Sequence, residues 1–131
     1  MTLQQLRTDD APVPTGPFSQ GVRVGSLVFT AGQAGRNRET GQMGDIKDQT
    51  TWALRNVAAI LAAAGASLVD VAKVTIFVRE GSDVQALNAA YVEAFRTAGC
   101  GDYLPARSLV FVSSLKNPDM LVEIETIAAL A

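Results

Sequence analysis

The residues best suited to chemistry lie near the C-terminal end of the chain, where two charged types stand in apolar surroundings. Arg107 follows Pro105 and opens an otherwise uncharged run, and a guanidinium there can bind a carboxylate through two parallel hydrogen bonds. Glu123 and Glu125 stand two residues apart among apolar residues, where a carboxylate must be paired or wet and can hold a water for attack. A surface arginine and two solvated glutamates are the ordinary alternatives, and both stay open.

Two other segments carry groups that a small ligand could contact. Asn88 falls within the apolar arc of a predicted helix, together with Val84 and Tyr91. Its amide should therefore point inward and needs a partner, which is either a neighbouring backbone group or a ligand. Ala31 and Gly32 put small residues at a strand end, where the backbone can approach a ligand closely, although a tight turn has the same composition.

The residue types that are absent exclude several kinds of active site. The sequence has no histidine and a single cysteine, Cys100. This excludes Ser-His-Asp and Cys-His nucleophiles, the commonest zinc ligand and an intrachain disulfide. Cys100 lies between two glycines without a group that would activate it, so we interpret it as incidental. The glycines around residue 32 match neither phosphate-loop pattern. An enzyme with this sequence must work with carboxylate, arginine, amide, hydroxyl or backbone groups.

Length and composition predict one domain over residues 1–131. The net charge is −2, and the eleven Lys and Arg residues are scattered rather than clustered, which disfavours nucleic acid as the main partner. No apolar run reaches the roughly 18 residues of a membrane-spanning helix. Residues 1–10 lack the pattern of a signal peptide. We therefore expect a cytoplasmic protein without membrane contact.

Apolar periodicity predicts the elements that position these residues. Their order is strand-strand-helix-strand-helix-strand-strand (ββαβαββ), which predicts a single α+β domain with a mixed sheet and two helices on one face. Asp45 is expected to cap the first helix and Gly65 to end it, whereas Ser82 and Gln85 form a capping-box pattern at the second. The stretch before Gly16 and residues 36–44 are expected to be irregular. The predicted strands are Gly21–Gly25, Leu27–Thr30, Val71–Arg79, Arg107–Ser113 and Leu121–Ala128, and the predicted helices are Asp45–Ala64 and Asp83–Ala98.

The predicted strand over Arg107–Ser113 is apolar on both faces. Leu109 and Phe111 alternate with Val110 and Val112, so the two pairs point to opposite sides of the sheet. The helices cover one side. The other side is expected to pack against a second copy of the chain, which makes the protein an oligomer.

Several short stretches, spread along nearly the whole chain, resemble the Rid/YjgF family of enamine and imine deaminases. Any one of them is weak, but their order and spacing together are specific. They are Gly16-Pro17-Phe18-Ser19-Gln20-Gly21, Thr30-Ala31-Gly32-Gln33, Thr40-Gly41, Asn56-Val57 with Ala64-Gly65, Asn88 with Tyr91 and Phe95, Pro105-Ala106-Arg107-Ser108, and Val122-Glu123-Ile124-Glu125-Thr126-Ile127-Ala128.

The resemblance implies a chorismate-mutase-like homotrimer with three equivalent clefts between subunits. It implies hydrolysis of reactive 2-imino acids, of the 2-aminoacrylate and 2-iminopropionate type, to 2-keto acids and ammonia, without cofactor or metal. Arg107 would hold the substrate carboxylate and Glu123 would position the attacking water. Asn88 and the backbone around Ala31 and Gly32 would line the same cleft.

Three positions depart from the family pattern. Phe18 stands where a tyrosine is typical, Ala31 where a serine is common, and Leu109 where a cysteine is common. The cleft is therefore more apolar, which suits an imine bulkier or more apolar than 2-iminopropionate. The alternatives are an RNA-cleaving translation inhibitor, which the charge and the lack of histidine disfavour, and a non-catalytic ligand sensor or chaperone.

The spacing of Arg107 and Glu123 predicts that one chain does not bring both to one substrate. If Arg107–Ser113 and Leu121–Ala128 formed an antiparallel hairpin, the two residues would lie about 13 Å apart along the sheet. A neighbouring subunit of the implied trimer would then bring its own Arg107 to this Glu123, so the site is expected to lie between subunits.

Overall fold

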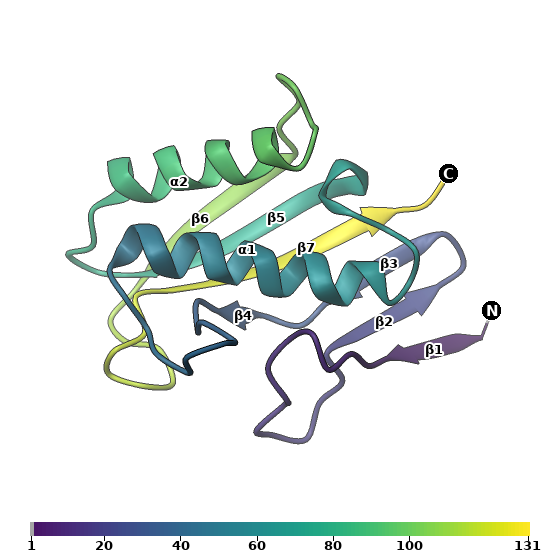
Figure 1. Cartoon of the computed structure of the whole chain (residues 1–131), viewed down its shortest axis with the longest axis horizontal. Helices are drawn as coiled ribbons and strands as arrows, with labels where there is room; N and C mark the ends of the chain where they lie inside the picture. The colour runs from purple at the N-terminus through teal and green to yellow at the C-terminus, as the bar shows by residue number, and fades with distance from the viewer. Residues whose placement is uncertain (1) are drawn as a thin grey trace.

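One mixed sheet forms the centre of the protein, and two α-helices lie side by side across one of its faces (Figure 1). The computed structural model describes residues 2–131. The strands are β1 (Leu3–Leu6), β2 (Gly21–Val24), β3 (Leu27–Thr30), β4 (Gln33–Ala34), β5 (Val71–Arg79), β6 (Ala106–Val112) and β7 (Val122–Ala129), and the helices are α1 (Ile46–Ala62), the short 3₁₀ helix η1 (Leu68–Asp70) and α2 (Val84–Thr97). The predicted α+β class with both helices on one face is confirmed.

Two short strands are absent from the predicted order. β1 lies in the N-terminal stretch expected to be irregular, and it pairs antiparallel with β2 at the edge of the sheet. Only Leu6 of its four residues is buried, so the apolar alternation that identifies a strand is too short to detect. β4 is a two-residue strand, Gln33–Ala34, that pairs with Glu123 and Ile124 of β7.

The last strand, β7, occupies the middle of the sheet, and this corrects the predicted pairing. The strand order is β1-β2-β3-β7-β5-β6, with β4 also paired to β7. β6 pairs in parallel with β5, and β7 pairs antiparallel with β3 and β5. The predicted hairpin between Arg107–Ser113 and Leu121–Ala128 is therefore wrong. Its premise fails because β5, α2 and β6 form a strand-helix-strand crossover, and β7 then enters on the other side of β5.

The helix ends follow the predicted capping in one helix and differ in the other. The Asp45 carboxylate accepts a hydrogen bond from the Asp48 N–H at 2.9 Å, and Gly65 has a φ of 76° just beyond α1, so both predictions for α1 are confirmed. At α2 the cap is Asp83, whose carboxylate accepts from the Ala86 N–H at 3.1 Å. The predicted capping box starting at Ser82 is wrong, because the carboxylate one residue later is the group that reaches the helix N–H.

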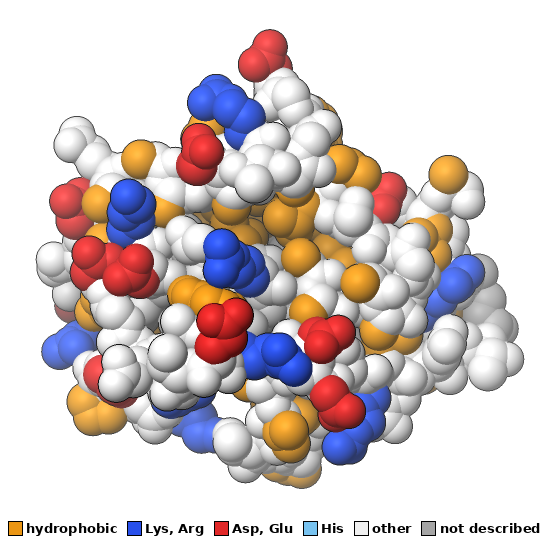
Figure 2. Space-filling model, viewed as in Figure 1, with side chains coloured by type: hydrophobic (Ala, Val, Ile, Leu, Met, Phe, Trp, Pro, Cys, Tyr) orange, Lys and Arg blue, Asp and Glu red, His pale blue; other side chains and the backbone are white. Residues whose placement is uncertain are grey.

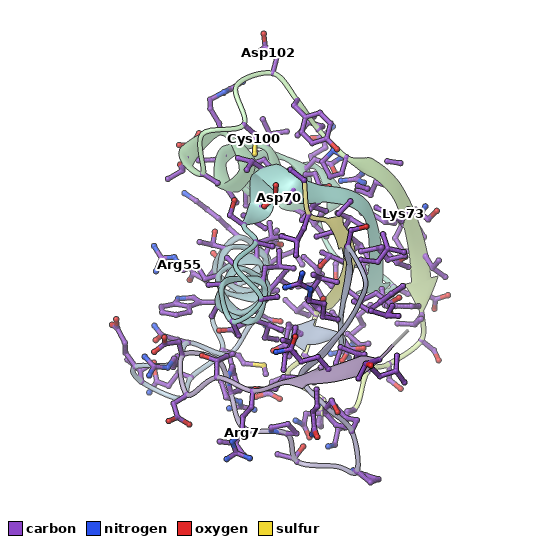
Figure 3. All side chains as sticks on the ribbon, turned by 90° about the vertical axis from the view of Figure 1, so that its right-hand side faces the viewer. Arg7, Arg55, Asp70, Lys73, Cys100 and Asp102 are labelled. Atoms are coloured by element: carbon purple, nitrogen blue, oxygen red, sulfur yellow. The ribbon has the colours of Figure 1, made fainter. Side chains whose placement is uncertain are left out.

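The face of the sheet opposite the helices is uncovered. Lys73 of β5 points away from α1 on this side, whereas Arg55 projects outward from α1 on the other (Figure 3). Apolar residues on the uncovered face include Phe29 and Val110, which are 38% and 44% exposed. The expectation that a second copy covers this face stays a prediction.

The outer surface of the helices carries an apolar groove of its own. Hydrophobic side chains gather between α1 and α2 with charged residues around them (Figure 2). Alanine is the commonest residue type in the lining of this groove, which has a volume of about 680 Å³. Neither Arg107 nor Glu123 lines it, so it is separate from the candidate site. Within residues 2–131, no helix has both the length and the hydropathy needed to cross a membrane.

Candidate active site

Glu123 lies on the uncovered face of β7, at one end of the sheet, and its side chain lines a cleft. Its strand neighbours Val122 and Ile124 point to the helix side and are fully buried, whereas Glu123 is half-buried. The cleft has a volume of about 210 Å³. Among its lining residues are Phe18 from the N-terminal loop, Gly32 from the turn before β4, and Lys116 from the loop before β7.

The backbone at Gly32 approaches the Glu123 carboxyl group closely. A Cβ at position 32 would lie 2.8 Å from Cδ and 2.9 Å from Oε2 of Glu123, closer than side-chain carbons pack. Glycine is therefore required for the carboxylate to occupy this place. The predicted approach of the Ala31–Gly32 backbone to a ligand stays a prediction, and the close neighbour that the structure gives Gly32 is Glu123.

The surroundings of Glu123 favour a basic carboxylate. Burial raises the pKa of Glu123 above its ordinary value of 4.5, and the neighbouring Glu125 charge raises it further, while Lys116 lowers it. The Lys116 ammonium donates a hydrogen bond to Thr15 Oγ1 at 2.6 Å, which fixes its position in the cleft. Within residues 2–131 no cation approaches Glu123 within ion-pair distance, since the one ion pair joins Arg38 to Asp10.

Arg107 lies at the start of β6 and lines a second cleft, of about 240 Å³. Its guanidinium carbon is 4.9 Å from the centre of the Tyr91 ring. The other lining residues of the cleft are Asn88, Val92, Leu104 and Pro105. The Asn88 Oδ1 atom is buried and has no hydrogen-bond partner in the described chain. Burying a hydrogen-bond acceptor without a partner costs folding free energy. No neighbouring backbone N–H within residues 2–131 donates to Asn88 Oδ1.

The register places Arg107 and Glu123 on opposite faces of the sheet. Arg107 lies beside Val74 of β5, on the helix side, and Glu123 lies beside Phe77, on the uncovered side. The two residues are also three positions apart along the strands and two strands apart, or roughly 14 Å. The predicted separation within a chain is therefore correct in size, but its cause is the strand order and the faces rather than a hairpin.

The other candidate residues from the sequence lie in the Glu123 cleft, in the Arg107 cleft, or in neither. Phe18, 49% exposed, and Gly32 join Glu123, whereas Asn88 joins Arg107. Ala31 is half-buried and donates its backbone N–H to Gln20 O at 2.8 Å. Leu109 packs against the core on the helix side and lines neither cleft.

Two buried side-chain amides, which were not predicted from the sequence, form hydrogen bonds with the backbone of segments around the Glu123 cleft. Gln20, 3% exposed, donates to the carbonyls of Thr8 and Pro12 and accepts from the Thr8 N–H. Gln49 on α1 accepts from the Leu121 N–H at 2.8 Å and donates to Asp119 O, so it fixes the segment just before Glu123. The signal for Gln49 was available, because it falls on the apolar arc of α1 where a polar group must be satisfied.

The described residues contain no group of three or more Asp, Glu, Cys or His side chains that could hold a metal ion.

Comparison with known proteins identifies the class to which this fold and sequence belong. A crystal structure of TdcF from Escherichia coli with bound serine superposes with a TM-score of 0.91, at 38% identity, over 98% of this chain and 99% of that one. A RutC family protein of Pyrococcus abyssi is 44% identical over 130 residues, which is 98% of each chain. The 2-iminobutanoate/2-iminopropanoate deaminase of E. coli K12 is 41% identical over 124 residues, which is 94% of each chain.

The sequence profile of the family described as endoribonuclease L-PSP matches residues 8–130. The chain belongs to this family, which is the Rid/YjgF family that its motifs resemble.

Proposed function

We propose that this protein is an imine deaminase that hydrolyses 2-imino acids to 2-keto acids and ammonia. The observation that carries the proposal is the Glu123 carboxylate. It is half-buried against the Gly32 backbone, forms no ion pair within residues 2–131, and has a raised pKa. Relatives about 40% identical bear the name 2-iminobutanoate/2-iminopropanoate deaminase, which supports the same reaction here.

The reaction needs little beyond positioning, because an imine carbon is already electrophilic. Water oxygen bonds to the C=N carbon as Glu123 accepts one proton from that water, and Glu123 then gives this proton to the imine nitrogen. In the resulting amino alcohol the hydroxyl proton passes through Glu123 to the nitrogen, the C–N bond breaks, and ammonia leaves the 2-keto acid. A carboxylate with a raised pKa is a stronger base for the first step than an ordinary glutamate and a competent acid for the return of the proton.

In this mechanism Arg107 binds the carboxylate of the substrate. Its guanidinium can form two parallel hydrogen bonds to the 2-carboxylate, which fixes the imine carbon relative to the water. Asn88 lines the same cleft as Arg107, and its buried Oδ1 has no hydrogen-bond partner within residues 2–131, which supports a role for this amide in binding the substrate. Phe18 and the neighbouring apolar residues of the Glu123 cleft favour a substrate with an apolar side chain.

A complete site on this account needs two chains, because Arg107 and Glu123 of one chain point to opposite faces of its sheet. We infer a closed ring, a homotrimer, in which the uncovered face of one copy lies against the edge strand β6 of the next. Phe111 and Val110 of β6, 55% and 44% exposed, are apolar enough to be buried by such a contact.

The proposal is tested with imines generated in place by an amino-acid oxidase and scored by the rates of imine decay and ammonia release. A panel of parent amino acids with small and bulky apolar side chains would reveal the preferred substrate. Faster decay with wild-type protein, and none above background with Glu123→Gln, is expected. Binding to RNA that weakens with salt, without faster imine decay, would instead favour the ribonuclease reading of the family description.

A further inference from the structure

The Arg107 guanidinium lies over an aromatic ring, Tyr91, that has no role in the mechanism proposed above. Its central carbon is 4.9 Å from the centroid of the Tyr91 ring, within the range of a cation–π contact. Arg107 is itself exposed at the strand end. A long, exposed side chain loses its conformational freedom when it binds a ligand, and a surface that holds it beforehand lowers that loss.

The ring that Arg107 contacts is rigid. Tyr91 is 3% exposed and lies in the middle of α2, and its ring packs against Phe95 one turn later, with the two centroids 4.8 Å apart. Phe95 is fully buried. The platform beneath Arg107 therefore belongs to the packed core of the protein rather than to a mobile loop.

The Tyr91 hydroxyl leaves the guanidinium donors free. Burial raises the pKa of Tyr91 to about 12, against the opposing effect of Arg107, so the side chain is neutral at any working pH. No hydrogen bond to this hydroxyl is present within residues 2–131. Because Tyr91 offers neither a phenolate nor a bonded oxygen to Arg107, the N–H groups of the fork remain available to a ligand carboxylate.

We propose that Tyr91 is a positioning residue, whose ring holds the Arg107 guanidinium in the orientation that binds the carboxylate of the ligand. The identity of that ligand as an imino or keto acid rests on the proposed function. The stacking contact and its rigidity are features of the chain itself. Tyr91 thus acts through Arg107, and the ring rather than the hydroxyl carries the effect.

The test uses the stable product 2-oxobutanoate as probe, with its dissociation constant measured by NMR titration of the intact protein. Tyr91→Leu removes the ring and should weaken binding about threefold to thirtyfold, the range that corresponds to a partly desolvated cation–π contact. Tyr91→Phe keeps the ring and should restore binding to within about twofold of wild type. In steady-state assays Tyr91→Leu should raise KM far more than it lowers kcat.

A matched control separates positioning from packing. Leu61→Ala removes a fully buried side chain of α1 that lines neither cleft; it should lower Tm at least as much as Tyr91→Leu, yet leave 2-oxobutanoate binding within about twofold of wild type. In an Arg107→Gln background, Tyr91→Leu should cause no further loss of affinity, because the group that it positions is gone.

Two results would overturn the inference. One is wild-type affinity in a folded Tyr91→Leu protein, and the other is equal loss in Tyr91→Phe and Tyr91→Leu. The proposed function fails separately. If wild-type protein binds 2-oxobutanoate through Arg107 but does not hasten imine decay, the deaminase assignment is wrong while the role of Tyr91 stands.

Discussion

At the residue scale, the Glu123 carboxylate is subject to opposing effects from its neighbours. Burial and the Glu125 charge raise its pKa, and Lys116 lowers it. Arg107 has no acidic partner in the described chain, since the one ion pair present there lies elsewhere. The two residues that the proposed mechanism uses therefore form no ion pair within residues 2–131, and their charges remain available for substrate and water.

Replacing Arg107 by lysine should remove most of the activity although the charge is kept. An ammonium cannot form the two-pronged contact with a carboxylate, and we expect kcat/KM to fall by about tenfold or more. Arg96→Lys, in the last turn of α2, is the control and should be neutral. Near-normal imine hydrolysis by folded Arg107→Ala protein would show that the carboxylate is held elsewhere.

Glu123 and Glu125 offer an internal comparison, because both point to the uncovered face. Glu123→Gln keeps the shape and removes the base, so kcat should fall by about a hundredfold or more while 2-oxobutanoate still binds. Glu125→Gln should have a small effect, since Glu125 is exposed and lines neither cleft. If Glu125→Gln is the more damaging change, the base has been misassigned.

The pH dependence should follow the charges around Glu123. Activity requires the ionised carboxylate, so it is present above the pKa of Glu123 and lost as the pH falls through it. Removing Lys116, which lowers this pKa, should move the acid limb of kcat/KM to higher pH in Lys116→Met. Glu125→Gln should move it to lower pH.

Both shifts should shrink in high salt, because Lys116 and Glu125 are exposed. The two variants share the same substrate, so titration of the imine itself cancels in the comparison. An acid limb that neither variant moves would mean that Glu123 is not the titrating group.

At the element scale, the sequence predicted what lies on each strand better than which strands are neighbours. β5 was predicted at its observed bounds, because the segment is dense in β-branched residues. The partners of β6 and β7 were predicted wrongly, because alternation specifies faces and carries no information on strand order. β1 and β4 are too short to produce a pattern.

Some residues of the candidate site could be predicted from the sequence, and others could not. Arg107, Glu123 and Asn88 could be singled out because their polarity conflicts with apolar surroundings. Tyr91 could not, since a tyrosine within an apolar helical stripe is indistinguishable from any core residue. Lys116 could not either, because a lysine in a loop is ordinarily solvated, and only the fold places it in the Glu123 cleft.

The turn between β3 and β4 should be sensitive to a single methyl group. In Gly32→Ala the added Cβ would displace the flexible Glu123 side chain, which lies 2.8 Å away, so kcat should fall by about tenfold or more with little change in Tm. Gly21→Ala is the contrasting variant, because its Cβ would lie 2.7 Å from Ile60 Cγ2 in the core. It should destabilise the protein by about 1–3 kcal/mol. Full activity in Gly32→Ala would contradict the placement of Glu123.

At the scale of the whole molecule, the proposed assembly connects the Glu123 cleft, the Arg107 cleft and the uncovered sheet face. The helices cover one face of the sheet, while Phe29 and Val110 remain exposed on the other. Burying that face against a second copy removes apolar surface from water. The same contact would bring the Glu123 cleft of one chain to the Arg107 cleft of another, so association and catalysis would depend on the same surface.

Complementation between two inactive variants tests this account most directly. Arg107→Ala and Glu123→Ala proteins are mixed in equal amounts, their subunits are exchanged under conditions where mass spectrometry shows mixed oligomers, and imine hydrolysis is measured. If each site takes Arg107 and Glu123 from different copies in a ring, about one quarter of the sites should contain both native residues, and about that fraction of wild-type activity should return. No recovery despite proven exchange would contradict the account, because both residues would then act from a single chain.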